Sequence, residues 1–126
     1  NTLRPVPLLP DVGLIDRAAI QAALQGLAED RLGSLITSFL DQGELTVSHM
    51  RAAVRNGQPL ELRVHAHAAR GAALNLGLAA LAQTAQALHE GAAHLPAHEV
   101  AHLVQRFESL LARTRAAAAA AGLIAA

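Results

Sequence analysis

The side chains most able to do chemistry gather in one short segment of this chain, from His67 to Gly77. A neutral histidine ring is a nucleophile that functions near neutral pH. On a helix, Arg70 and Gly71 would lie beside that ring, because they follow it by three and four residues. Glycine within a helix is unfavourable by about 0.5–1 kcal/mol relative to alanine. Gly71 therefore indicates that a partner needs access to His67.

Helical geometry predicts one outward face that combines the imidazole with positive charge. A helix turns by about 100° per residue, so Arg63, Arg70 and Gly71 would lie within about 60° of His67. Guanidinium groups beside a nucleophile can neutralise phosphoryl oxygens through charge-assisted hydrogen bonds. The spacing therefore predicts His67 as the reacting residue, and Arg70 and Arg63 as residues that neutralise phosphate.

The rim of this face carries apolar side chains that suit the docking of another protein. Val64 and Leu74 lie near His67 on the expected helix surface, and Gly71 leaves room for the partner. The sequence has no phosphate-cradling loop and no cluster of carboxylates for magnesium. We therefore predict no metal site in this chain and expect a partner protein to bring the metal.

The composition argues against several other classes of protein. The chain has 126 residues with 10 Lys+Arg and 10 Asp+Glu, so it lacks the positive field that attracts nucleic acid or anionic lipid. Phe and Trp platforms for base stacking are scarce, since only two phenylalanines and no tryptophan or tyrosine occur. The absence of cysteine agrees with a cytoplasmic protein. The uncharged stretch 71–88 contains polar residues, so we expect no membrane contact.

Alanine and leucine supply most of the apolar residues, and both favour helices. Periodicity and capping residues predict helices at about 16–25, 29–55, 59–75, 78–90 and from 96 into the alanine run 116–121. This pattern predicts an all-α, antiparallel up-down-up-down four-helix bundle with a short N-terminal capping helix. We assign 1–13 to an extended Pro-rich linker, 14–122 to the bundle and 123–126 to a frayed C-terminal tail, and we expect the last turns of the alanine run to fray.

One face of each predicted helix carries the candidate core. Two of these apolar faces are on the long second helix and on the helix with His67. The apolar residues of the second helix are Leu32, Leu35, Ile36, Phe39, Leu40, Val47, Met50 and Val54. On the helix with His67 they are Leu62, Ala66, Ala69, Ala73 and Leu76.

The segment resembles the signature of histidine-containing phosphotransfer (HPt) domains. That signature runs His-x-hydrophobic-Lys-Gly-Ser/Ala-Ala/Ser-x-x-hydrophobic-Gly. The matching positions are His67, Ala69, Arg70, Gly71, Ala72, Ala73, Leu76 and Gly77. The resemblance extends over the whole chain, and the family fold is a four-helix bundle. Two positions depart from the signature: Arg70 replaces lysine, which changes the geometry of the charge, and Ala69 replaces a larger hydrophobic residue.

The resemblance implies a function for each part of the segment. His67 would accept a phosphoryl group from an aspartate of a receiver (response-regulator) domain and pass it to another receiver. Arg70 would hold the phosphoryl group, and Gly71 would give access. The receiver would supply magnesium, so the resemblance implies no cofactor bound by this domain.

The resemblance also implies a place in two-component signal transduction. The domain alone would be a phosphocarrier without kinase activity. Its Pro-rich start favours the C-terminal module of a hybrid sensor histidine kinase over a free-standing protein. Its location would then be cytoplasmic, including the cytoplasmic end of a membrane-bound kinase.

Two other interpretations stay open on the residues alone. The chain could be a helical protein-interaction module without catalytic function, or a metal-binding bundle that uses His98 and His102, four residues apart. His65 lies about 200° around the helix from His67, so these two rings cannot bind one ion. We interpret His65 as a partly buried histidine with a hydrogen-bond partner.

Overall fold

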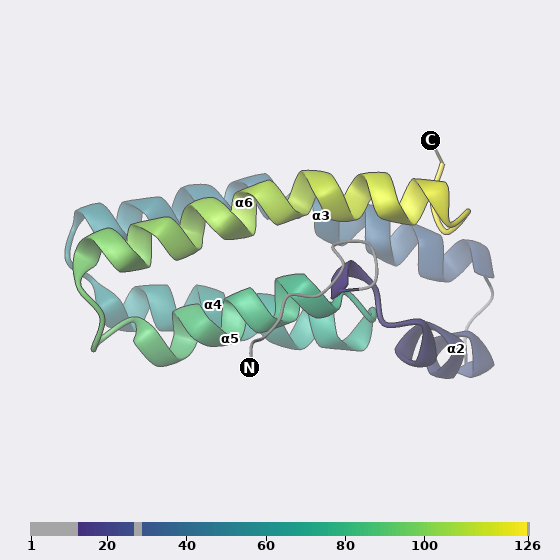
Figure 1. Cartoon of the computed structure of the whole chain (residues 1–126), viewed down its shortest axis with the longest axis horizontal. Helices are drawn as coiled ribbons and strands as arrows, with labels where there is room; N and C mark the ends of the chain where they lie inside the picture. The colour runs from purple at the N-terminus through teal and green to yellow at the C-terminus, as the bar shows by residue number, and fades with distance from the viewer. Residues whose placement is uncertain (1–12, 27–28, 126) are drawn as a thin grey trace, which may run out of the picture.

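Helices form most of the chain that the computed structural model describes, residues 13–26 and 29–125 (Figure 1). Their bounds are α2 Arg17–Gly26, α3 Glu29–Arg55, α4 Pro59–Asn75, α5 Ala79–Gly91 and α6 Ala97–Ala120. The described residues contain no strand, so the prediction of an all-α fold is confirmed. In these same residues no helix has the length and apolar character to cross a membrane. Except for Gly13, the predicted linker 1–13 lies outside the described residues.

The four long helices form a bundle around one core. Figure 1 shows α3 and α6 along one side of the bundle and α4 and α5 along the other. Each long helix packs against the one that follows it, and α6 packs against α3, whereas the diagonal pairs α3–α5 and α4–α6 do not pack. Because the connections are short, consecutive helices run in opposite directions. The predicted up-down-up-down four-helix bundle is confirmed.

The buried face of α4 decides which of its residues point outward. It consists of Leu62, Ala66, Ala69 and Ala73, as the apolar spacing predicts, and Leu76 after the helix is partly buried. Three of the four buried side chains are alanine, so the neighbouring helices can lie close to α4. The opposite face, which carries His67, is left to solvent.

The long helix α3 follows its predicted stripe with one exception. Ile36, Leu40 and Met50 are buried, but Leu35 is 41% exposed, so its prediction as a core residue was wrong. Neighbouring residues of a helix point about 100° apart. Since Ile36 takes the position that faces the core, Leu35 is turned to the edge of the helix.

The short helix α2 lies at one end of the bundle, where it contacts α3 and α4 (Figure 1). Asp16 is its N-cap, because Oδ1 accepts hydrogen bonds from the backbone N–H groups of Ala18 at 3.0 Å and Ala19 at 3.2 Å. The N–H of Asp16 donates to the carbonyl of Gly77 at 2.7 Å. Gly77 has a φ of 72°, and a Cβ there would lie 3.1 Å from the carbonyl oxygen of Asp16. Gly77 therefore allows the capping segment to dock where α4 ends.

The C-terminal alanine run packs against the bundle, so the expectation that its last turns fray was wrong. Helix α6 continues to Ala120, and Ala118 is fully buried. The N–H of Leu123 donates to the carbonyl of Ala118 at 2.9 Å, and Leu123 and Ile124 are half-buried against the core. Alanine buries little area by itself, but its small side chain allows close approach of other elements. Leu123 and Ile124, which follow the run, cover the end of the helix, and Ala126 of the predicted tail 123–126 lies outside the described residues.

Two exposed ion pairs join α3 to α6. Arg115 donates to Asp41 at 2.6 Å, and Arg51 pairs with Glu108. The hydrogen bond from Arg51 lowers the pKa of Glu108 below its ordinary value and raises the pKa of Arg51 itself. These side chains are largely exposed, so the pairs contribute little to stability. They link α3 to α6, and they lie away from the face of α4 that carries His67.

Candidate functional site

His67 is exposed in the middle of α4, on the side opposite to the buried alanines. Arg63, one turn earlier, is also exposed, and Arg70, nearly one turn later, is half-buried. All three side chains come from consecutive turns of a single helix, so local backbone geometry sets their relative positions. The structure thus brings together the imidazole and the two cations that the spacing singled out.

An apolar row runs along the same face of α4. Val64 is 62% exposed and Leu74 is 48% exposed, and Leu60 at the start of the helix is 71% exposed. Leu60 was missed by the sequence analysis, although its spacing of four residues from Val64 continues the row. Large apolar side chains that remain in water on both sides of a polar residue are typical of a protein-docking surface.

Gly71 leaves the space beside His67 open. A Cβ at this position would meet no heavy atom within 4 Å, so neither core packing nor backbone approach requires a glycine there. Its φ is also not in the positive range that marks Gly57, Gly77 and Gly122. The fold therefore requires Gly77 but not Gly71, and the open surface is the remaining explanation for Gly71.

A second imidazole lies next to His67, and the sequence analysis missed it. The ring of His89, from α5, has its centroid 5.5 Å from that of His67, and the two ring planes are inclined by 44°. Nη2 of Arg63 lies 3.5 Å from Nε2 of His89. The close packing of α4 and α5 brings His89 to this face. Only the register between α4 and α5 could have indicated this contact. Residue spacing within each helix does not give that register.

Arg63 contacts His89, whereas Arg70 has no side-chain partner among the described residues. Its guanidinium makes no ion pair or hydrogen bond with the part of the chain that the structure describes. A half-buried cation without a protein partner can pair with an anionic group that arrives from outside. The site thus offers a nucleophile, a second imidazole and two positive charges on an open surface.

His65 belongs to a separate pair on another side of α4. Its ring centroid lies 4.9 Å from that of His49, from α3, and its Nε2 lies 3.7 Å from the carboxylate of Glu61. The side chain of His65 is 28% exposed. The interpretation of His65 as a partly buried histidine with a polar partner is confirmed, and it does not face His67.

The pair His98 and His102, considered as metal ligands, lies exposed on α6. Across residues 13–26 and 29–125, no group of three or more His, Asp or Glu side chains is arranged to hold a metal ion. The structure therefore adds no third ligand to this pair, and a metal-binding bundle has no observation in its favour.

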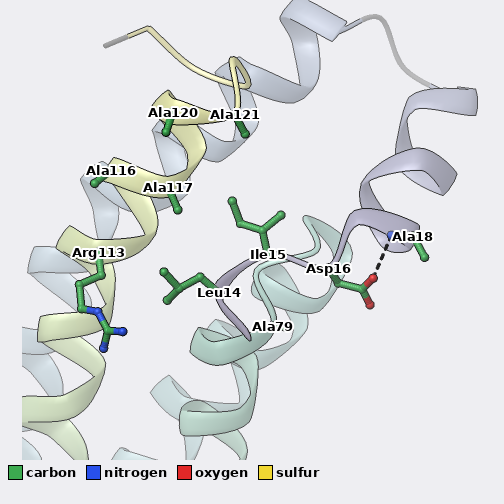
Figure 2. Close-up of a pocket in the computed structure, with 10 residues that line it drawn as sticks. All are labelled: Leu14, Ile15, Asp16, Ala18, Ala79, Arg113, Ala116, Ala117, Ala120 and Ala121. Carbon is green, nitrogen blue, oxygen red and sulfur yellow. Dashed lines mark hydrogen bonds between the residues drawn. The ribbon is translucent and has the colours of Figure 1, made fainter. Parts of the chain in front are cut away.

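A groove of about 940 Å³ lies away from the candidate site, between the start of the described chain and the end of α6 (Figure 2). Leu14 and Ile15 point toward the alanines of α6, and no histidine lines the groove. Asp16, which borders it, caps α2 with its carboxylate. Apart from Asp16 and Arg113 the groove is lined by apolar residues, so it lacks the imidazole found on the outward face of α4.

One of three comparisons with known proteins found a match, and it agrees with the fold. No model of a known protein family matches the chain, and no curated protein matches it either. Among solved structures, the chain is similar to histidine-containing phosphotransfer protein B (HptB) from Pseudomonas aeruginosa PAO1, with a TM-score of 0.70 and 29% sequence identity. The similarity covers 82% of this chain and 89% of that one. The shared bundle, together with the signature around His67, supports the prediction of a histidine-containing phosphotransfer domain.

Proposed function

We propose that His67 is the residue through which this domain acts as a phosphorelay intermediate in two-component signalling. A neutral ring nitrogen attacks the phosphorus of an aspartyl phosphate on a receiver domain. A bond forms between nitrogen and phosphorus, and the bond between phosphorus and the carboxylate oxygen breaks with its electron pair on the leaving carboxylate. The proton on the other ring nitrogen passes to water. Transfer to a second receiver reverses these steps.

The observation that carries this assignment is the exposure of His67 beside the open surface at Gly71. In-line attack requires the phosphorus to approach the ring nitrogen without obstruction. The exposed leucines and Val64 along the same helix face supply an apolar surface on which a receiver can dock. We infer that Val64, Gly71 and Leu74 make direct contact with that receiver.

The two arginines are the groups that neutralise the phosphoryl oxygens. Arg70 has no partner among the described residues, so its guanidinium is free to pair with the incoming group. Arg63 is exposed and lies against His89, from which it can reach the phosphoryl group at the edge of the site. The charge of the transferring group then meets two cations, which hold the group in line with the attacking ring nitrogen.

The proposed transfer step requires receiver domains as partners. Receiver domains bring the aspartate and the magnesium that its acidic pocket binds, and this domain binds no cofactor of its own. It acts as a phosphocarrier without kinase activity, and neither nucleic acid nor a membrane is a partner of the domain itself. We further propose that the domain acts in the cytoplasm.

The test is transfer from phosphorylated receiver domains of the same organism to the purified chain. We expect acid-labile phosphate on the wild-type chain and none on His67→Gln. His65→Gln is the matched control, since it removes an imidazole two residues away that faces His49 instead. Transfer to His67→Gln at the wild-type level would show that the acceptor is another residue. Stable binding of receivers without any transfer would favour the alternative of an interaction module.

A further inference from the structure

His89 is a second imidazole at the site, and neither the motif nor the proposed transfer step uses it. It comes from α5, whereas every other residue assigned to the site comes from α4. Its ring lies 5.5 Å from the ring of His67, between centroids, with an inclination of 44°. A phosphoryl group on the exposed nitrogen of His67 would extend the side chain beyond its ring. The tilted neighbouring ring is therefore close enough to contact that group.

The contact with Arg63 favours the tautomer of His89 that leaves Nε2 without a proton. Nη2 of Arg63 lies 3.5 Å from Nε2 of His89. Arginine has donors and no acceptor, so Nε2 of His89 is the acceptor in this contact. In the neutral ring the proton then sits on Nδ1, because the two nitrogens of a neutral imidazole divide the roles of donor and acceptor. His89 consequently keeps one N–H donor that Arg63 does not use.

The other charged groups near His89 do not compete for this donor. Arg63, His89, Glu90 and His94 line a shallow groove of about 340 Å³ between α4 and the end of α5. Glu90 is the acidic side chain of this groove, and its carboxylate accepts a hydrogen bond from the side-chain amide of Gln86. His94 is exposed after α5 has ended. Among the charged side chains of this groove, Arg63 contacts His89, whereas the contact of Glu90 is with Gln86.

We propose that His89 is a hydrogen-bond donor to the phosphoryl group on His67, and that Arg63 holds its ring in place for this contact. The inference rests on the proposed function of His67. Nδ1–H of His89 donates to a phosphoryl oxygen that exists only in the phosphorylated state. Loss of a phosphoryl group passes through a loose transition state that draws charge away from these oxygens. The hydrogen bond therefore stabilises phosphohistidine more than the transition state, and it prolongs the lifetime of the phosphorylated domain.

The experiment measures the half-life of phosphohistidine in the full chain. The chain is phosphorylated with phosphoramidate, freed of the reagent and followed by phosphorus NMR, with the His67→Gln spectrum used to assign the signal of His67. His89→Phe keeps the ring and removes both nitrogens, whereas His89→Gln keeps a hydrogen-bond donor. His49→Phe is the matched control, since it makes the same change in the other histidine pair. Thermal unfolding of each variant checks that the bundle is intact.

We expect His89→Phe to shorten the half-life about fivefold, and His89→Gln and His49→Phe to stay within about twofold of the wild type. A purely structural role for the ring would give the opposite order, with phenylalanine tolerated and glutamine not. A half-life for His89→Phe that is equal to or longer than that of the wild type would overturn the inference. A wild-type chain without phosphate on His67 would overturn the proposed function as well, so the two failures can be told apart.

Discussion

Two histidine pairs join α4 to its neighbours, and they share a geometry but not an environment. His65 lies beside His49 of α3, with ring centroids 4.9 Å apart, and His67 lies beside His89 of α5 at 5.5 Å. Each pair links a residue of α4 to a different neighbouring helix. Under the proposed assignment of His67, a pair of adjacent imidazoles is not sufficient to make a phosphotransfer site.

The difference lies in the charged residue one turn before each histidine of α4. Glu61 precedes His65 and places its carboxylate 3.7 Å from the ring, whereas Arg63 precedes His67. A carboxylate repels an anionic phosphoryl group, and a guanidinium attracts it. Gly71 adds open space on the side of His67 only. We therefore propose that charge and access, more than the presence of histidine, distinguish the side of α4 that takes part in phosphotransfer.

The strongest test of this comparison makes the surroundings of His67 resemble those of His65. Arg63→Glu places a carboxylate one turn before His67 and removes the contact with His89. We expect the rate of phosphoryl transfer from a receiver to fall about thirtyfold, which corresponds to about 2 kcal/mol of like-charge repulsion. Rapid-quench transfer assays measure this rate. Glu61→Gln is the control and should leave it unchanged, and an equal loss in both variants would contradict the assignment of the two sides.

A second test concerns the apolar row that borders His67 but not His65. Val64→Asp puts a charge in the middle of the proposed docking surface, where Val64 is 62% exposed. We expect the Kd for a receiver domain to rise about tenfold, because the carboxylate loses water on docking. Titration by fluorescence or calorimetry measures the Kd. Gln105→Asp, an exposed change on α6, provides the reference, and the docking surface lies elsewhere if it weakens binding as much.

A third test separates the role of charge from that of its geometry. Arg70→Ala removes a half-buried cation that has no partner among the described residues, so the transfer rate should fall about fivefold with little loss of stability. Arg70→Lys restores the charge and should recover most of the rate. Single-turnover transfer at two salt concentrations measures both. A rate that does not respond to Arg70→Ala would leave Arg63 as the sole phosphate-neutralising residue.

The last test compares the two glycines of the motif by their effect on stability. Gly71→Ala should raise the free energy of unfolding by about 0.5–1 kcal/mol, because its Cβ meets nothing and alanine is the better helix former. Gly77→Ala should lower it by about 1–2 kcal/mol, since its φ is 72° and its Cβ would press on Asp16. Denaturation in urea measures both. Destabilisation by Gly71→Ala would mean that the fold, and not access, requires this glycine.

Much of the fold and most of the site residues could be predicted from the sequence. The helix over 59–75 matched its predicted bounds, since Pro59 begins it and Gly77 follows its end. The exposed face of that helix follows directly from residue spacing. Leu35 and the alanine run could not be predicted correctly, because their burial depends on which neighbour lies against them. His89 was missed for the same reason.

The sequence by itself determined which residues share the outward face of α4. Within one helix the backbone repeats a fixed rise and rotation, so the relation of His67 to Arg63, Arg70 and Gly71 needs no other part of the chain. Only the tertiary structure decided that His89, 26 residues after Arg63, completes that face. The contact depends on the length of the turn between α4 and α5 and on how closely their small buried side chains let the two helices pack.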